Sequence, residues 1–317
     1  MTIRSELVYV RRVQRFGGFC RDWTWRIRIK VLYIAGSGRS GTTIISRLLG
    51  EFPGFVNVGE AVRHFFDDNE RARTVPCGCG QPVSECEFWR DIAGSISTET
   101  QASGAELLRL RRFPKLFLRS AHPGVPTEYC DTATAISSMY ERVLRKAGGE
   151  VIVDASKSPM RGLLVSLLPD VELHVLHVVR DPQKVTESWN RKKGFLATHP
   201  PWKVAVRWWP ENLFSGALRF RANTYRLLRY EDFVSSPGPL LQEIAADVAG
   251  TPLLTPFLSG RRATFRVQHL LGGNPDKFDS LEVQIEERDG QSEPRRVLVD
   301  LLTFPLQLRY DYLPLRR

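Results

Sequence analysis

One short stretch near the beginning of the chain constrains the fold more than any other. Residues 31–36 form an apolar, strand-like run, residues 36–43 read Gly-Ser-Gly-Arg-Ser-Gly-Thr-Thr, and an apolar-periodic segment follows. A strand that enters a glycine- and hydroxyl-rich turn and leaves it as a helix is the layout of a phosphate-binding loop, because the helix start offers backbone N–H groups to an anion. We therefore expect an α/β protein that holds an anion at one edge of its sheet.

The remainder of the chain alternates strand-like and helix-like segments. Apolar runs predict strands over residues 31–36, 55–58, 151–154, 173–179 and 225–233. Apolar periodicity and end signals predict helices over residues 42–50, 106–119, 132–147, 160–168, 183–192, 240–249 and 295–303. Five strands alternating with helices predict a mostly parallel five-stranded sheet. Because the carboxyl ends of parallel strands meet at one edge, Glu60 is expected beside the phosphate-binding loop.

Length and composition predict one large domain. The chain has 317 residues, 42% of them apolar, which is enough for a single core over residues 31–317. Residues 1–30 hold eight Arg and Lys against two acids and are expected to form a basic extension. The irregular composition of residues 61–130 predicts an insertion over the active-site edge. No run of 18 apolar residues occurs, so we expect no membrane span and, by default, a cytoplasmic protein.

The net charge of +10 indicates that the protein handles anions. A nucleic acid, an acidic membrane surface and a phosphorylated small molecule all fit this charge. Aromatic residues are not interleaved with the basic amino-terminal run, so a nucleic-acid partner is not expected. A non-catalytic anion-binding protein remains an alternative.

The five cysteines form an odd number, which argues against a full disulfide framework and for a reducing compartment. Cys77, Cys79 and Cys86 are the one cluster. Structural zinc normally takes four ligands, so a metal here would need an outside partner such as His64 or a water. A local disulfide is a further alternative. We favour a tightly turned loop with buried thiols and expect no metal.

The phosphate-binding loop departs from the loop of nucleotide triphosphatases at one position. Gly36 and Gly41 have the spacing of that motif, but the lysine that reaches the β- and γ-phosphates is replaced by Thr42, followed by Thr43. The basic residue of the loop is Arg39. This pattern favours a nucleotide with one phosphate and an adjacent reacting group. A P-loop small-molecule kinase, which would need the lysine and Mg²⁺, is the alternative.

A second group of residues fits a second phosphate. A predicted strand delivers Arg180 to the carboxyl edge of the sheet, and Ser188 follows about two turns into the next helix. Arginine makes forked, charge-assisted contacts with phosphate. A salt bridge or a helix cap would explain the same two residues if they were the only signal.

Taken together, these residues resemble the sulfotransferase family that uses 3′-phosphoadenosine 5′-phosphosulfate (PAPS). Residues 36–43 look like its 5′-phosphosulfate loop, and residues 179–188 look like its 3′-phosphate motif. Five more segments match in order, and these lie at residues 58–60, 77–89, 153–157, 228–232 and 272–275. The resemblance spans about residues 31–313 and is typical of bacterial members with carbohydrate-type sulfotransferase domains.

The resemblance implies a fold, a reaction and a set of partners. The fold is the three-layer α/β fold of P-loop nucleotide kinases. The reaction moves a sulfuryl group from PAPS, without a metal, to a hydroxyl or amine of an acceptor, most often a carbohydrate or small metabolite. Within the 5′-phosphosulfate loop, the donor-binding residues would be Gly38, Arg39, Ser40, Gly41, Thr42 and Thr43.

The resemblance also implies catalytic roles. Transfer is an in-line displacement in which negative charge grows on the leaving phosphate, and Arg39 and Lys157 match the family's cations for that charge. The acceptor must lose a proton to a general base. Cytosolic members use a histidine, whereas Golgi-type and several bacterial members use a glutamate after the second strand, which Glu60 matches. His64 is the rival base.

The 3′-phosphate of the donor would be held by residues from two parts of the chain. Relatives often have Arg-Phe after the Gly-Asn-Pro motif, where this chain reads Asp-Lys-Phe at residues 276–278. No tryptophan follows in residues 280–293, so we expect the adenine to stack on another aromatic residue. The implied 3′-phosphate ligands are Arg180, Ser188, Gly273, Asn274 and Lys277.

Overall fold

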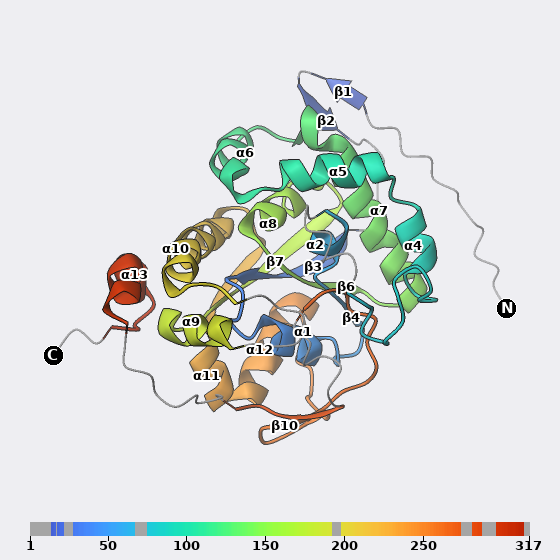
Figure 1. Cartoon of the computed structure of the whole chain (residues 1–317). Helices are drawn as coiled ribbons and strands as arrows, with labels where there is room; N and C mark the ends of the chain where they lie inside the picture. The colour runs from blue at the N-terminus through green and yellow to red at the C-terminus, as the bar shows by residue number, and fades with distance from the viewer. Residues whose placement is uncertain are drawn as a thin grey trace.

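The computed structural model describes residues 14–16, 18–21, 28–66, 75–191, 198–273, 281–286 and 296–313. At its centre lies a five-stranded sheet with the order β4-β6-β3-β7-β8, in which every pair is parallel (Figure 1). The strands are Ile29–Gly36 (β3), Phe55–Gly59 (β4), Val151–Lys157 (β6), Val171–Val179 (β7) and Thr224–Arg229 (β8). The predicted sheet is thus confirmed, and it is wholly parallel.

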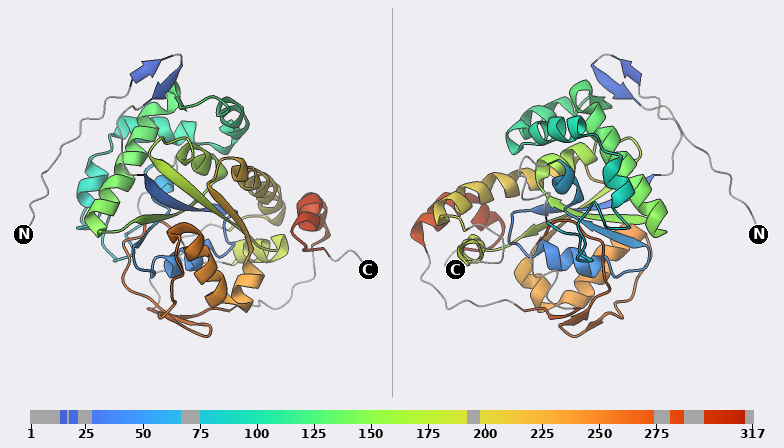
Figure 2. Two further views of the ribbon diagram at one scale, coloured as in Figure 1. Left: turned by 180° about the vertical axis from the view of Figure 1, so that it is seen from behind. Right: turned by 45° about the vertical axis from the view of Figure 1, so that its right-hand side comes forward.

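The sheet lies between two layers of helices (Figure 2). One layer contains Ala61–Phe65 (α2), Arg90–Gly94 (α4), Thr98–Leu107 (α5), Phe113–Arg119 (α6), Cys130–Ala147 (α7) and Pro159–Val165 (α8). The other contains Thr42–Leu49 (α1), Tyr230–Ser235 (α11) and Pro237–Ala249 (α12). Three further helices pack against one another, and these are Pro182–Asn190 (α9), Pro201–Ala217 (α10) and Val297–Arg309 (α13). Among them, α10 also contacts α8, β3 and β7.

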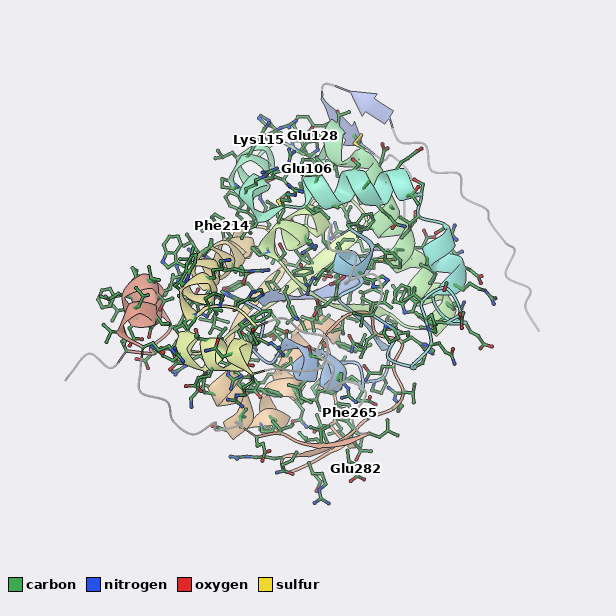
Figure 3. All side chains as sticks on the ribbon, in the orientation of Figure 1. Glu106, Lys115, Glu128, Phe214, Phe265 and Glu282 are labelled. Carbon is green, nitrogen blue, oxygen red and sulfur yellow. A yellow bond between two sulfur atoms is a disulfide. The ribbon has the colours of Figure 1, made fainter. Side chains whose placement is uncertain are left out.

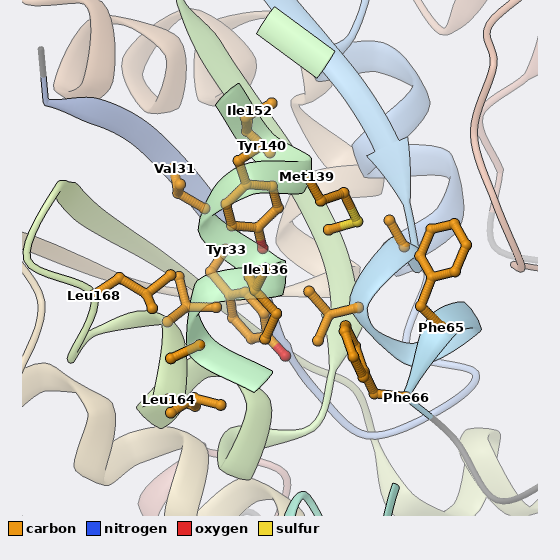
Figure 4. Packing of buried hydrophobic residues seen from close by; sticks show 14 of the residues in the cluster. Val31, Tyr33, Phe65, Phe66, Ile136, Met139, Tyr140, Ile152, Leu164 and Leu168 are labelled. Carbon is orange, nitrogen blue, oxygen red and sulfur yellow. The ribbon is translucent and has the colours of Figure 1, made fainter. Parts of the chain in front are cut away.

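Alternation along the central strand explains this three-layer arrangement. In β3, Val31 and Tyr33 join the core on the α7 side, whereas Leu32 and Ile34 join the core on the α1 side. A parallel strand covered on both faces is apolar without interruption, which is why the sequence of β3 shows no polar alternation. Figure 4 shows Tyr33 packed with Tyr140 in the first of these cores.

Two small antiparallel ribbons extend the fold. Gln14–Phe16 (β1), Phe19–Arg21 (β2) and Val125–Pro126 (β5) form one, and Leu258–Ser259 (β9), Arg262–Thr264 (β10) and Glu282–Gln284 (β11) form the other. Figure 3 shows Glu106 and Glu128 near the end of the molecule that carries the first ribbon, and Phe265 and Glu282 at the opposite end. Residues 14–21 were expected in a solvated extension. In the structure, β2 of this stretch pairs with β5.

A disulfide fastens the first ribbon to the helical layer. Cys20 on β2 is bonded to Cys130 at the start of α7. Cys77, Cys79 and Cys86 are free thiols. The odd number of cysteines agrees with three free thiols, but the count gave no indication of this one long-range bond.

Three helical segments differ from the sequence-based expectation. Residues 230–233 were predicted to end a strand, but they form the first turns of α11, where Glu231 and Asp232 favour a helix start. The helix predicted over residues 106–119 is interrupted, because Arg109 has an extended backbone with ψ 136°. Residues 201–217 form α10, a helix that the Trp- and Pro-rich composition of its first half concealed.

None of the helices in the described part of the chain has the length and apolarity that a bilayer span requires.

Candidate active site

The phosphate-binding loop joins the central strand β3 to α1, as predicted. Gly41 caps α1 in a left-handed conformation with φ 82°, and the ring of Tyr230 occupies the space that a side chain at residue 41 would need. Gly36 is as tightly confined, because a Cβ atom there would meet the carbonyl oxygen of Val178 on β7. Glycine is therefore required at both positions of the motif by backbone conformation and by space.

Arg39 is a non-glycine residue in the same left-handed region, with φ 71°. Such strain clusters at ligand-binding positions, and turns of this kind form concave anion sites from backbone N–H groups. Its guanidinium lies 5.0 Å from the ring centroid of Trp189 on α9. The same tryptophan ring would lie 3.1 Å from a Cβ at Gly38. Trp189 thus packs directly on the loop.

The hydroxyl groups of the loop are withdrawn from solvent. Ser40 is fully buried, and its Oγ atom has no hydrogen-bond partner among the described residues. Thr42 is buried as well, and the first turn of α1 contains no acidic side chain. A buried polar group without a partner needs an explanation. An anion seated at the start of α1 would supply the missing partner for Ser40.

Glu60 and Lys157 meet at the carboxyl ends of the neighbouring strands β4 and β6. Lys157 Nζ donates to Glu60 Oε1, and Arg63 Nη1 donates to Glu60 Oε2 at 2.5 Å. Glu60 is only 3% exposed. Burial by itself would raise the pKa of Glu60, but the two cations outweigh burial and lower the pKa to about 2. Glu60 is therefore a carboxylate held by two positive charges.

The turn at the end of β6 places Lys157 next to the phosphate-binding loop. Lys157 is the register partner of Ala35 on β3, and its φ of 65° is left-handed. The side chain of Asp154 shapes this strand end by accepting a hydrogen bond from Ser156 N at 2.7 Å and one from Tyr140 Oη at 2.8 Å. Burial raises the pKa of Asp154 to about 6, although both hydrogen bonds act in the opposite direction.

Arg180 lies on the other side of the phosphate-binding loop. It directly follows β7, and its Nη1 atom donates to the carbonyl oxygen of Arg39 at 3.3 Å. Its guanidinium lies 4.6 Å from the ring centroid of Tyr230. Ser188 is half-buried on α9, one residue before Trp189. The structure thus brings Arg180 to the loop and places Ser188 on the helix that packs against it.

The Gly272-Gly273 segment packs against both Glu60 and the phosphate-binding loop. Glu60 N donates to the carbonyl oxygen of Leu271 at 2.7 Å, so the segment is anchored at the end of β4. A Cβ at Gly272 would lie 2.9 Å from Glu60 Cβ, and one at Gly273 would lie 3.3 Å from Thr43 Cγ2. Both glycines are left-handed, with φ 63° and 85°. The other two predicted ligands, Asn274 and Lys277, lie outside the described residues.

Three residues of this site were not predicted from the sequence. Arg63 follows Glu60 by three positions, a helical spacing that could have indicated the ion pair. Trp189 and Tyr230 approach the loop from α9 and α11, and sequence alone carries no signal for contacts between such distant segments. The ring of His64, the rival base, is buried and lies edge-on to Phe65 at 5.1 Å.

A cavity elsewhere on the molecule is not part of this site. It is lined by residues near the amino ends of β4 and β6, including Gly54, Val56 and Gly149. The phosphate-binding loop lies at the carboxyl ends of these strands, which is the edge where ligands of parallel sheets bind.

The sequence motifs and this geometry agree with a comparison against known families. A sequence model of the sulfotransferase family matches residues 32–252, a range that contains the phosphate-binding loop, Glu60, Lys157 and Arg180. The chain is a member of the sulfotransferase family. The predicted resemblance is therefore confirmed, and sulfuryl transfer is the general activity of the family to which this sulfotransferase belongs.

One solved structure supports the fold of the sulfotransferase, and two others have lower similarity. The sulfotransferase domain of the olefin synthase from Synechococcus PCC 7002 is 18% identical, over 89% of this chain and 96% of that chain, with a TM-score of 0.50. The tunicamycin resistance protein of Deinococcus radiodurans is also 18% identical, over 72% and 100% of the two chains, with a TM-score of 0.35. Retinol dehydratase in a complex with retinol and PAP is 16% identical, over 73% and 62%, with a TM-score of 0.32. No curated protein matched the chain.

Proposed function

We propose that this sulfotransferase moves a sulfuryl group from PAPS to a hydroxyl or amine of an acceptor, a carbohydrate or small metabolite. The observation that carries the proposal is the position of Lys157, which pairs with Glu60 and is the register partner of Ala35 at the start of the phosphate-binding loop. A cation and a buried carboxylate are thus side by side next to an anion site.

The donor would be held at two places. The backbone N–H groups and hydroxyls of residues 38–43 would bind the 5′-phosphosulfate, which supplies a partner for the buried Ser40 hydroxyl. Arg180, Ser188 and the segment that begins at Gly273 would bind the 3′-phosphate, together with Asn274 and Lys277. The approach of Arg180 to the Arg39 carbonyl supports a single donor spanning both places.

The transfer step follows from these positions. The acceptor oxygen donates a lone pair to sulfur while the bond between sulfur and the bridging phosphate oxygen breaks, and the electron pair of that bond stays on the leaving phosphate. Arg39 and Lys157 stabilise this new charge. Glu60 takes the proton of the acceptor hydroxyl. The products are a sulfated acceptor and 3′-phosphoadenosine 5′-phosphate.

Glu60 is a poor base while it is paired with two cations, since these hold its pKa near 2. The bound phosphosulfate competes for Lys157, because it carries negative charge close to the same ammonium group. Weakening the Lys157 contact raises the pKa of Glu60 and makes the carboxylate a better proton acceptor. Glu60 therefore becomes an effective base only when the donor is present.

Two measurements test the proposal. A thermal-shift assay with 3′-phosphoadenosine 5′-phosphate should raise the melting temperature, and labelled PAPS should transfer its label to members of a panel of hydroxyl and amine compounds. Absence of any stabilisation by the nucleotide would count against the donor assignment. Stabilisation without transfer to any acceptor would favour an anion-binding protein, and Mg²⁺-dependent ATP hydrolysis would favour a small-molecule kinase.

A cytoplasmic location stays a prediction for this sulfotransferase. The free thiols of Cys77, Cys79 and Cys86 support it, whereas the Cys20–Cys130 disulfide counts against it, because disulfides are rare in reducing compartments. Thiol labelling of the protein in intact cells would measure the redox state of this pair.

A further inference from the structure

A cluster of three thiols and one imidazole lies outside the donor site. The Sγ atoms of Cys77, Cys79 and Cys86 and a ring nitrogen of His269 all lie within 4.8 Å of one another. Cys77 and Cys86 are fully buried, and Cys79 and His269 are half-buried. The segment 77–86 supplies only three of the four groups. His269 lies 183 residues beyond Cys86, so a local sequence pattern could not indicate a complete set of four ligands.

Three distances within the cluster are close to those of a tetrahedral site. Cys79 Sγ and Cys86 Sγ are 3.7 Å apart, and His269 Nδ1 lies 3.3 Å from Cys86 Sγ and 3.7 Å from Cys77 Sγ. With zinc–sulfur and zinc–nitrogen bonds of about 2.3 and 2.0 Å, tetrahedral geometry requires S···S edges of about 3.8 Å and S···N edges of about 3.5 Å. Three of the six ligand–ligand distances are therefore close to coordination spacing, and all six lie within 4.8 Å.

The backbone around the thiols is folded so that they converge. Cys77 N donates to the carbonyl oxygen of Gln81 at 2.9 Å, and Gly80 N donates to the carbonyl oxygen of Cys77 at 2.8 Å. Gly80 is left-handed, with φ 89°. This tight turn brings Cys79 back beside Cys77. A turn that only buried its thiols would not need an imidazole nitrogen to face all three of them.

His269 is held in place by two neighbours. Its backbone carbonyl accepts a hydrogen bond from Trp89 Nε1 at 2.5 Å. Its ring stacks on that of Phe88, with centroids 5.0 Å apart and an interplanar angle of 10°. The first contact holds the backbone and the second holds the ring, whose Nδ1 faces Cys77 and Cys86.

We propose that Cys77, Cys79, Cys86 and His269 bind one zinc ion, and that this zinc fastens the Gly272-Gly273 segment to the rest of the enzyme. Three thiolates and one imidazole suit zinc among the common metals. All four positions of the tetrahedron are taken by protein atoms, so the site is structural, with no position for a substrate.

A short backbone segment, residues 269–272, connects the proposed zinc site to the candidate active site. Gly78 N donates to the carbonyl oxygen of Leu270 at 2.9 Å, and Leu271 N donates to the carbonyl oxygen of Val58 at 3.0 Å. Gly272, which packs against Glu60, follows His269 by three residues. Metal binding itself is independent of the proposed function, whereas its effect on donor binding rests on it.

The metal content of the purified full-length chain tests the site directly. Protein produced with zinc in the medium should contain about one zinc ion per chain. Protein produced with Co²⁺ should show the visible absorption bands of a tetrahedral cobalt–thiolate centre. The Cys86→Ser and His269→Ala variants should lose zinc, whereas a Cys20→Ser/Cys130→Ser variant, which removes the two other cysteines, should keep it.

Thiol reactivity of the unmodified protein provides a second test, which does not depend on whether a variant folds. Three thiols should resist a thiol reagent until a zinc chelator is added, and only then react. A chain that binds neither zinc nor Co²⁺ in stoichiometric amount, or whose three thiols react at once without chelator, would overturn the proposal. The thermal shift with 3′-phosphoadenosine 5′-phosphate is measured on the same samples, so failure of the zinc site and failure of the donor assignment give different results.

Discussion

Among single residues, Glu60 has the most specific environment. It is almost fully buried, yet two cations hold it as a carboxylate near the phosphate-binding loop. Replacement of Glu60 by Gln should lower kcat by about 10²- to 10⁴-fold, because a positioned base contributes this much. Binding of 3′-phosphoadenosine 5′-phosphate, measured by calorimetry, should persist.

Glu51 offers a matched control for this variant. It is another buried glutamate, paired with Arg266 at 2.9 Å. Glu51→Gln should leave kcat unchanged even where it destabilises the fold. Full activity of Glu60→Gln, together with loss of activity in His64→Ala, would move the base role to His64.

Ser40 permits a second prediction at this scale, because its buried hydroxyl has no partner among the described residues. A buried hydroxyl left without a hydrogen bond costs about 1–3 kcal/mol. Ser40→Ala should therefore leave the free energy of unfolding of the ligand-free protein equal or higher, while the affinity for 3′-phosphoadenosine 5′-phosphate falls. Denaturant unfolding and calorimetry measure the two effects.

Ser46 on α1 provides the comparison. It is also buried, but its Oγ atom donates to the carbonyl oxygen of Thr43 at 3.0 Å. Ser46→Ala should leave the affinity for 3′-phosphoadenosine 5′-phosphate unchanged. Unchanged affinity in Ser40→Ala would show that the hydroxyl does not face the ligand.

At the scale of elements, the end of β6 links a buried acid to the position of Lys157. The pKa of Asp154 is about 6 in the folded protein, against an ordinary value of 3.8. Between these values this carboxyl binds a proton in the folded chain but not in the unfolded chain, so the contribution of Asp154 to stability falls as the pH rises from about 4 to 6. A difference of about two pKa units corresponds to roughly 3 kcal/mol.

The Asp154→Asn variant should remove this dependence, because asparagine does not titrate. Urea unfolding at pH 4.5 and pH 7 should show the variant gaining stability relative to the natural protein as the pH rises, because the opposite contribution of the buried His177, whose pKa burial lowers to about 4, is common to both proteins. Identical pH dependence in the two proteins would contradict the raised pKa. The pH–rate profile of the variant would further report whether Lys157 has moved.

Elements were predictable where local pattern and burial agree. The helix over residues 42–50 and the strand over residues 151–154 have strong apolar patterns between glycine signals, and α1 and β6 match them. β1 and β2 were missed because each has three residues, and their pairing depends on β5 more than a hundred residues later. A local pattern cannot contain a partner that distant.

At the scale of the whole molecule, the topology explains how much of the site was predictable. Parallel strands bring Arg39, Glu60, Lys157 and Arg180 to one edge, so strand assignment alone placed these residues together. The contacts of Trp189 and the approach of His269 to the thiols were not predictable. They depend on how helices and loops pack, and short sequence patterns do not encode this.

The Cys20–Cys130 disulfide gives a prediction at the same scale. It closes a loop with a sequence separation of 110 residues. In the chain-entropy model, such a bond stabilises a fold by about 4–5 kcal/mol, although measured values are often lower. A Cys20→Ser/Cys130→Ser variant should lose part of this free energy of unfolding in denaturant titrations.

Reductant separates this effect from the loss of two side chains. The natural protein should become less stable when reductant is added, whereas the variant should not respond. Equal sensitivity of both proteins would assign the effect of reductant to other thiols.

The left-handed backbone at Arg39 and Lys157 places two requirements in conflict. Stability favours glycine at these positions, whereas the proposed reaction needs cations there. A residue with a side chain in this conformation lowers the stability of the folded state by about 1–3 kcal/mol. Glycine avoids most of this strain. A library randomised at both positions and sorted for folded yield alone should therefore accumulate glycine. The same library sorted for sulfuryl transfer should keep cations, and equal residue frequencies in the two pools would contradict this trade-off. Sequencing both pools would give the frequencies of glycine and of cations at the two positions. The difference between the pools measures how much stability is lost when cations are kept for the proposed transfer.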